Sequence, residues 1–119
     1  MTDPTSRAKT WWLLQALSGL ALVLLLGVHF VAQHYVAQGG LRTYAQVVAY
    51  VRHPAVAALE AIFLVVVAVH AALGLRAVAL DFGLPAARQR SLNAALAVGV
   101  VLVVGYGLWL LAQVRGGAG

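Results

Sequence analysis

The sequence contains no cysteine, and this absence removes several kinds of chemistry at once. Without thiols the chain cannot form disulfides, hold a metal or an iron–sulfur cluster through thiolates, or attach haem covalently through a Cys-x-x-Cys-His motif. The single methionine, Met1, lies outside every apolar run, so a methionine ligand within the membrane is also excluded. A metal or haem iron bound by this chain must be held by histidine or by oxygen.

Charged residues are also scarce. They make up 9% of the chain, and only 3 of the 119 residues are acidic. A typical soluble domain has about 25% charged residues. With 63% hydrophobic residues, so short a chain carries more apolar surface than a soluble core of its size can bury. The lipid bilayer is therefore the expected solvent.

The eight lysines and arginines, which give a net charge of +5, lie at the ends of the apolar runs. They form no basic stripe and are not interleaved with aromatic residues, so the charge pattern argues against a nucleic-acid partner. Positive residues in these places are typical of helix ends that are anchored at lipid headgroups.

Three apolar runs, residues 11–36, 54–80 and 92–112, are each long enough to cross the membrane. A span of about 30 Å takes about 20 residues. None of the runs has an internal proline, and Pro54 suits the first turn of a helix. The first run is too long for a signal peptide and has no clear cleavage site, so we expect it to be retained. The prediction is an all-α integral membrane protein, with residues 1–119 forming one membrane domain of three transmembrane helices.

The charges that flank these runs predict the orientation. One side carries five positive residues and the other carries three: Arg7, Lys9, Arg76, Arg88 and Arg90 against Arg42, Arg52 and Arg115. Because positive charge favours the cytoplasmic side, the N-terminus and the second loop are predicted to be cytoplasmic, in an inner (cytoplasmic) membrane protein. The first loop, residues 37–53, would face outward with Tyr44 and Tyr50 at the interface.

His70 is the most informative histidine, because no polar residue precedes Arg76 in the apolar run 62–80. An ionisable side chain at bilayer depth is costly and marks a functional site by default. Neutral imidazole is also a favoured axial ligand of haem iron. The alternative is a histidine that bonds a carbonyl of a neighbouring helix.

The other histidines carry weaker signals. His29 lies toward the outer end of the first span, where a ligand role and a structural role are equally compatible with the sequence. His34 follows five residues later, about 500° around a helix, and is expected near a headgroup or a haem propionate. His53 precedes a proline at a helix start, and we assign it no role.

The sequence also predicts how far apart in depth the two candidate ligands lie. At about 1.5 Å per residue, His29 is roughly 27 Å from Trp11, and His70 is roughly 16 Å from Asp81. If those helix ends are level, the two histidines differ in depth by about 10 Å. Two haems are implied if both are ligands, and the facing ligands must then come from another subunit.

Arg76 and Asp81 flank the cytoplasmic end of the second span, where Gly83 ends the helix. They are either residues of an ordinary helix end or contacts for a haem propionate or a quinone headgroup. Arginine suits a propionate because a guanidinium can donate two parallel hydrogen bonds to a carboxylate. Glu60 lies within the same span, and the sequence does not decide between a protonated, a paired and a proton-conducting carboxyl group.

Residues 70–76, HAALGLR, followed by DFG at 81–83, resemble the second-helix motif of the membrane anchor subunits of succinate dehydrogenase and fumarate reductase. The stretch WWLLQALSG at 11–19, with His29 and His34 after it, is similar to the tryptophan-rich first helix of that family. The order of three helices with a cytoplasmic N-terminus also matches. The spacing from His70 to Asp81 resembles the smaller, D-type anchor more than the C-type anchor.

The resemblance implies a role for several residues. His70 falls on the axial ligand of haem b, and His29 falls where two-haem members place a first-helix ligand. Arg76 and His34 are implied as propionate neighbours, and Asp81, Ser18 and Trp12 as quinone contacts.

Two positions depart from the family pattern. Members often carry an arginine just before the serine of the first helix, and here residues 15–17 are QAL. Members that donate a tyrosine to ubiquinone carry it after the aspartate, where this chain has Phe82. Because phenylalanine has no hydroxyl to donate, menaquinone is the quinone that the resemblance favours.

The leading hypothesis is therefore a haem b-binding anchor of respiratory complex II, which links the tricarboxylic acid cycle to electron transport. Its expected partners are a sister anchor subunit, which completes the helical bundle, an iron–sulfur subunit, a flavoprotein subunit, quinone and lipid. The chain would be a non-catalytic subunit, because it has neither a dinucleotide motif nor a cysteine. The alternatives are a cytochrome b subunit of another quinone-linked enzyme and a haem-free structural or transporter subunit.

Overall fold

The computed structural model describes residues 3–36, 39 and 43–117, and within these residues every regular element is helical. The elements are α1 (Pro4–Val31), a π-helical turn η1 (Ala32–Val36), α2 (Tyr44–Arg52), α3 (Pro54–Asp81) and α4 (Ala86–Gly116). The molecule measures 52 × 26 × 25 Å, longer than the hydrocarbon core is thick. The predicted all-α class is confirmed.

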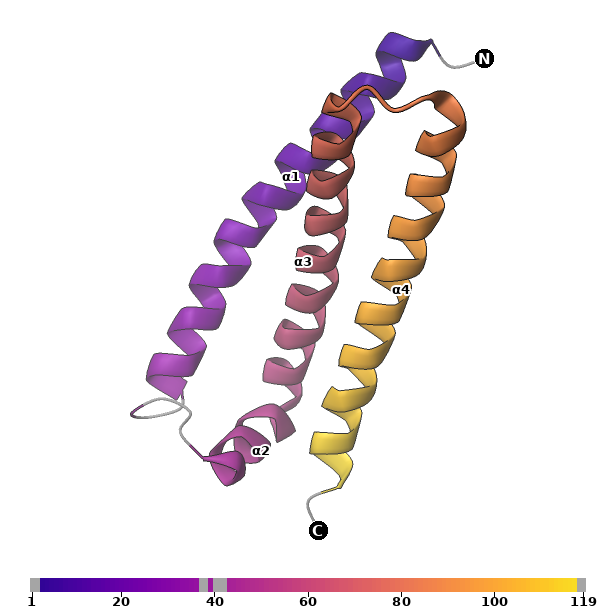
Figure 1. Cartoon of the computed structure of the whole chain (residues 1–119). Coiled ribbons are helices and arrows are strands. Elements are labelled where there is room, and N and C mark those ends of the chain that lie inside the picture. Colours follow the sequence, from indigo (N-terminus) through magenta and orange to yellow (C-terminus); the bar gives the residue numbers. More distant parts are fainter. Residues whose placement is uncertain (1–2, 37–38, 40–42, 118–119) are drawn as a thin grey trace.

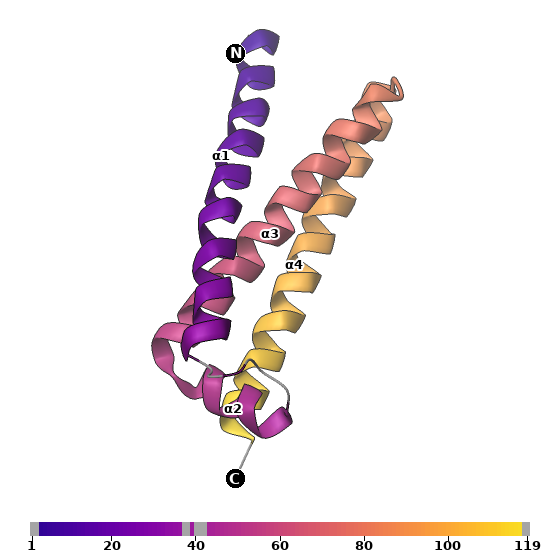
Figure 2. The ribbon, with the colours of Figure 1, turned by 90° about the vertical axis from the view of Figure 1, so that its left-hand side faces the viewer.

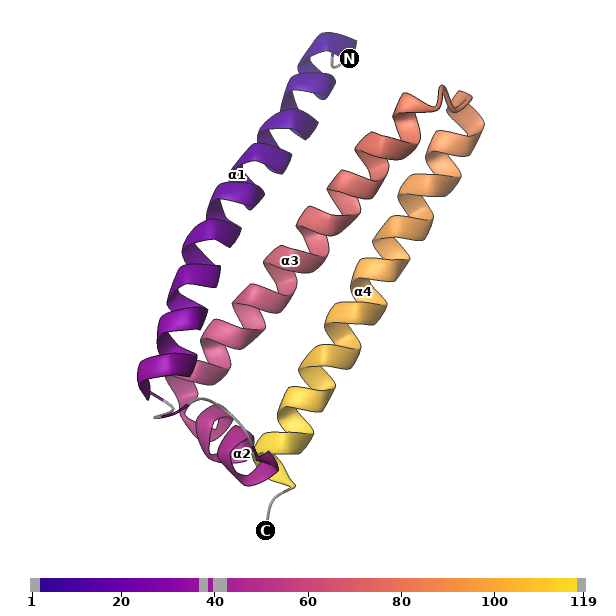
Figure 3. The same ribbon diagram turned by 60° about the vertical axis from the view of Figure 1, so that its left-hand side comes forward.

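The three long helices run alternately up and down, with α3 between α1 and α4 (Figures 1 and 3). The N-terminus and the α3–α4 connection lie at one end, and α2 and the C-terminus lie at the other. Figure 2 shows that α1 and α3 come together near α2 and diverge toward the N-terminal end. We call these the α2 end and the N-terminal end of the molecule.

Three helical segments of the described chain are long and apolar enough to cross a membrane: Pro4–Tyr35, Pro54–Asp81 and Ala86–Gly116. The first begins before the predicted residue 11, because the Asp3 side chain accepts a hydrogen bond from the Thr5 backbone N–H at 3.2 Å and Pro4 occupies the first turn. The third extends beyond the predicted 92–112 at both ends. Polar helix ends lie outside the hydrocarbon, so hydropathy alone does not detect them.

Helix α2 lies within the segment that the sequence analysis treats as a loop. It begins with a capping box, in which the Thr43 hydroxyl accepts from the Gln46 N–H at 3.3 Å and the Gln46 side chain accepts from the Thr43 N–H at 2.9 Å. This Thr-x-x-Gln pattern is a recognised helix-start signal and was readable in the sequence. Arg42, which contributes to the predicted charge bias, lies outside the described residues.

Buried side chains gather at the α2 end. Those below a tenth exposed among the described residues are Val48, Tyr50 and Val51 of α2 and Val56 and Ala57 of α3. Ala32, Leu111 and Val114 pack against this cluster. No residue of α1 or α4 is buried. Most of the apolar surface of the spans therefore remains for lipid or for other helices to cover.

Replacing Thr43 by Ala should destabilise α2 locally. Loss of an N-cap hydroxyl costs about 1 kcal/mol, which corresponds to about fivefold faster opening. Hydrogen–deuterium exchange of the α2 amides in lipid nanodiscs measures this effect. Thr10→Ala is the matched control, because the Thr10 hydroxyl bonds only the Ser6 carbonyl of its own helix. Equal exchange in the two variants would contradict the capping role.

Candidate functional site

His70 contacts α1 through a hydrogen bond in the middle of the helix layer. Its Nδ1 lies 2.9 Å from the hydroxyl of Ser18, and that hydroxyl lies 3.0 Å from the Gln15 carbonyl oxygen of the preceding turn. The imidazole is half-buried between the two helices. The structure thus joins two residues that the sequence analysis assigns to different ligands, His70 to haem and Ser18 to quinone.

The two contacts of the Ser18 hydroxyl favour one tautomer of His70. A carbonyl oxygen only accepts, so the single hydroxyl hydrogen points to Gln15, and the hydroxyl oxygen then accepts from His70. In this arrangement Nδ1 of the histidine is the donor. Nε2 is left with an uncommitted lone pair and bonds no residue in the described part of the chain. A neutral imidazole with a bare Nε2 is the form that ligates iron.

Gly19 lets the imidazole lie directly on the backbone of α1. A Cβ built at this position would stand 3.2 Å from His70 Cε1, which is tighter than ordinary contact. One turn away along the same interface, a Cβ at Gly74 would stand 3.4 Å from the Gln15 side-chain nitrogen. Small residues at these crossings are what allow close helix approach in lipid.

His29 has a different partner at a different level. Its Nδ1 lies 2.9 Å from Glu60 Oε1, and the ring stacks on Phe63 at 5.0 Å between centroids. Both paired side chains are about one-fifth exposed, at 20% and 21%. The Tyr50 hydroxyl donates to the same carboxylate oxygen at 3.2 Å. Of the three roles that the sequence leaves open for Glu60, the structure shows a paired carboxyl group with two hydrogen-bond partners.

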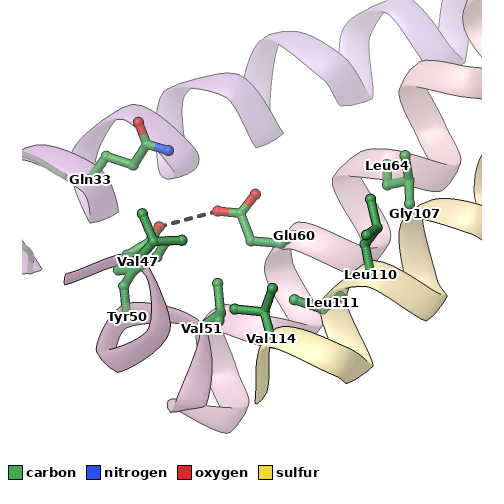
Figure 4. Close-up of a pocket in the computed structure, with 10 residues that line it drawn as sticks. All are labelled: Gln33, Val47, Tyr50, Val51, Glu60, Leu64, Gly107, Leu110, Leu111 and Val114. Carbon is green, nitrogen blue, oxygen red and sulfur yellow. Dashed lines mark hydrogen bonds between the residues drawn. The ribbon is translucent and has the colours of Figure 1, made fainter. Parts of the chain in front are cut away.

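Glu60 also lines a hollow of about 360 Å³ at the α2 end, with Gln33 across from it and apolar side chains of α2 and α4 around it (Figure 4). Burial, and then the neighbouring Glu60 carboxylate, raise the pKa of Tyr50 to about 12. The hydroxyl therefore stays protonated and remains a donor at physiological pH.

The two hydrogen-bonded pairs give the separation of the histidines along the layer. Ser18 and His29 are 11 residues apart on α1, and Glu60 and His70 are 10 apart on α3, so both helices give about 15 Å. This exceeds the expected 10 Å, which assumed that Trp11 is level with Asp81. Trp11 instead lies beside Arg76, more than a turn further into the layer.

Arg76 lies at the N-terminal end, where its guanidinium carbon is 4.3 Å above the Trp11 ring and its Nε donates to Asn93 at 2.9 Å. Its terminal NH₂ groups donate to no acceptor among the described residues. The sequence alone did not indicate Trp11 or Asn93 as contacts of Arg76. An aromatic residue at a helix start and an asparagine in an otherwise apolar run were the available signals.

A hollow of about 830 Å³ opens at this end among α1, α3 and α4, and we call it the N-terminal hollow. Trp12, Arg76 and Asp81 all line it, so the structure brings together three of the predicted site residues. Arg7 and Arg90 add positive charge to its wall. A flat ring with polar substituents could stack on tryptophan here and bond to the arginine and carboxylate.

The remaining predicted residues lie elsewhere. Ser18 contacts His70 and is not among the lining residues of the hollow, although Gln15, three residues before it, is. His34 stacks on Phe30 at 4.0 Å at the opposite end of α1, so His34 and Arg76 cannot contact one and the same haem. His53 is exposed at the start of α3.

No group of three or more His, Cys, Asp or Glu side chains that could hold a metal ion occurs within the described residues. A haem does not require such a group, because the porphyrin supplies four ligands and the protein supplies axial ones. His70 Nε2, which bonds no residue in the described part of the chain, is the atom of this chain that would hold the iron of a haem.

Comparisons with known proteins agree with this architecture. Residues 5–106 match the family model described as the succinate dehydrogenase/fumarate reductase transmembrane subunit. The chain is 38% identical over 100 residues to the succinate dehydrogenase hydrophobic membrane anchor subunit of Archaeoglobus fulgidus, covering 84% of this chain and 85% of that protein. No solved structure matches at a significant level.

The raised pKa of Tyr50 predicts a pH dependence at the α2 end. A folded pKa near 12 against the ordinary 10.0 means that Tyr50 contributes stability fully below pH 10 and loses it as the pH rises toward 12. Tyr50→Phe should abolish this loss, and Glu60→Gln should lower the folded pKa without restoring 10.0, because burial remains. The pH dependence of thermal stability measures the first effect and tyrosinate absorbance the second, with the exposed Tyr44→Phe as control. A Tyr50 that titrates at 10 in the folded protein would disprove the prediction.

Proposed function

The chain belongs to the family of succinate dehydrogenase and fumarate reductase transmembrane subunits, and from this membership and the geometry of His70 we propose that it binds haem b. It is a membrane anchor subunit whose three apolar helices make it a multi-pass membrane protein. In the proposal, the anchor also contributes to the passage of electrons to quinone.

The bare Nε2 of His70 is the observation that carries the proposal. The Ser18 bond commits Nδ1 as a donor and leaves the second nitrogen without a partner, in a span where an unsatisfied polar atom is costly. Iron ligation satisfies that atom. When bound, haem b supplies a one-electron carrier within the membrane, and the protein positions it and tunes its potential.

A sister anchor subunit supplies the second axial ligand in this proposal. Of the other histidines in the spans, His29 lies about 15 Å away along the layer and cannot face the same iron. His34 lies further still, in η1. His29 also presents an Nε2 opposite its Glu60 bond, so it is the candidate ligand of a second haem. The largely exposed apolar faces of α1 and α4 are available to the helices of the sister subunit.

The N-terminal hollow is the proposed quinone contact of this chain. Trp12 offers an aromatic face, and the Asp81 carboxylate can accept a proton from a quinol hydroxyl or return one to a reduced quinone oxygen. The unused NH₂ groups of Arg76 suit a haem propionate. The absence of a hydroxyl at Phe82 favours menaquinone over ubiquinone.

The same end is the proposed docking face for the iron–sulfur and flavoprotein subunits. Arg7, Lys9, Arg88 and Arg90 lie on α1 and α4 at this end, and positive residues favour the cytoplasmic side. That orientation puts the quinone hollow next to the soluble subunits in the cytoplasmic membrane, so electrons need not cross the bilayer to reach it.

Replacing His70 by Gln should remove a b-type haem from the purified complex, because no other side chain at that level can ligate iron. The reduced-minus-oxidised spectrum and the haem content per complex measure the loss. His53→Gln is the matched control and should keep full haem. His29→Gln should remove part of the haem if two are present. A full b-type spectrum in the His70 variant would refute the ligand assignment, and a haem-free wild-type complex would support the structural-subunit alternative.

Replacing Asp81 by Asn should slow quinone reduction by about 100-fold, the usual scale for loss of a proton-transferring group. Electron transfer from succinate to a water-soluble dye should be unchanged, because the dye takes electrons from the soluble subunits. Asp3→Asn, at the exposed start of α1, is the control for lost negative charge. Equal quinone activity in the two variants would rule out a role for Asp81.

A further inference from the structure

The geometry points to Ser18 as a positioning residue, which fixes the tautomer and orientation of the haem-ligating His70 and so lowers the midpoint potential of the haem. This inference rests on the proposed haem function. It assigns Ser18 to the histidine instead of to the quinone.

The hydrogen-bond chain has a single direction. The Gln15 carbonyl accepts from the Ser18 hydroxyl at 3.0 Å, and the hydroxyl oxygen accepts from His70 Nδ1 at 2.9 Å. The reverse arrangement would leave the serine and carbonyl oxygens facing each other at 3.0 Å with no hydrogen between them. The serine therefore selects the tautomer that leaves Nε2 bare.

Gly19 restrains the same edge of the ring. The position of its missing Cβ is 3.2 Å from His70 Cε1, 3.8 Å from Nδ1 and 4.0 Å from Nε2, so the edge that carries all three atoms faces this glycine. A methyl group there would crowd the edge from which Nε2 must reach the iron. Consecutive residues of α1 thus contact the ring, Ser18 at Nδ1 and Gly19 nearest Cε1.

The bond to Ser18 also alters the electronic character of the ligand. An imidazole whose Nδ1–H donates to an oxygen becomes a more basic ligand through Nε2. A more basic ligand stabilises ferric haem over ferrous haem. Removing the acceptor should therefore raise the midpoint potential.

A purely structural serine would behave differently. Its loss would weaken the packing of α1 on α3 and lower the yield or the thermal stability of the complex. The potential and the ligand field of the haem that remains would not change. Midpoint potential and electron paramagnetic resonance therefore separate the two roles.

The experiment compares Ser18→Ala, Ser18→Thr and Ser91→Ala in the purified complex. Ser91 is the matched control, because its hydroxyl bonds only the Ala87 carbonyl of its own helix at 3.4 Å. We expect Ser18→Ala to lose about tenfold of the preference for ferric haem, a rise of about 59 mV for a one-electron couple. Ser18→Thr keeps the hydroxyl and should stay near wild type.

Gly19→Ala provides a second test that leaves the hydroxyl in place. It should reduce haem content or shift the ferric resonance, because the added methyl displaces the ring. The inference is overturned if Ser18→Ala has the potential and resonance of Ser91→Ala while its haem still depends on His70. A wild-type complex without a His70-dependent haem would instead defeat the proposed function itself, so the two failures are distinguishable.

Discussion

The register between α1 and α3 is the constraint on which the rest of the structure depends. Two polar contacts set it, from Ser18 to His70 and from His29 to Glu60. From the first contact to the second, α1 advances by 11 residues, and the antiparallel α3 runs back by 10. Lipid tails are as apolar as leucine, so burial of apolar surface does not align helices in a bilayer. Hydrogen bonds and close small-residue packing have to do so, and the two coincide where Ser18 and Gly19 contact His70.

This register gives the chain two different sites at two levels. The partner of His70 is a neutral hydroxyl. The partner of His29 is a carboxylate that also accepts a hydrogen bond from Tyr50. In each pair the histidine uses Nδ1 and keeps Nε2. The same register brings Trp11 beside Arg76 and so forms one wall of the N-terminal hollow. One alignment of two helices thus fixes the imidazoles and the cationic wall together.

Much of this could be predicted from the sequence, and the misses have physical causes. Apolar run length encodes the number of spans, so all three helices were predictable. An ionisable residue at bilayer depth makes His70 a candidate site residue. The level of one helix against another is not encoded in either helix alone. The predicted depth difference was therefore too small, because Trp11 is level with Arg76 and not with Asp81. Helix α2 was missed because its length is below that of a span, although Thr43 and Gln46 carry its start signal.

The polar atoms left without partners indicate which face of this layer needs another protein. Exposed leucines and valines can be covered equally well by lipid or by a sister helix, so they do not discriminate. His70 Nε2 and the terminal NH₂ groups of Arg76 cannot be satisfied by acyl chains. Both belong to α3, the central helix. The α2 end, in contrast, holds the buried cluster and the satisfied Glu60. His29 Nε2 is left bare beside Glu60 as well, and Gln15 Oε1 of α1 is buried without a hydrogen-bond partner. Polar atoms that a partner could satisfy therefore occur at both levels of the layer.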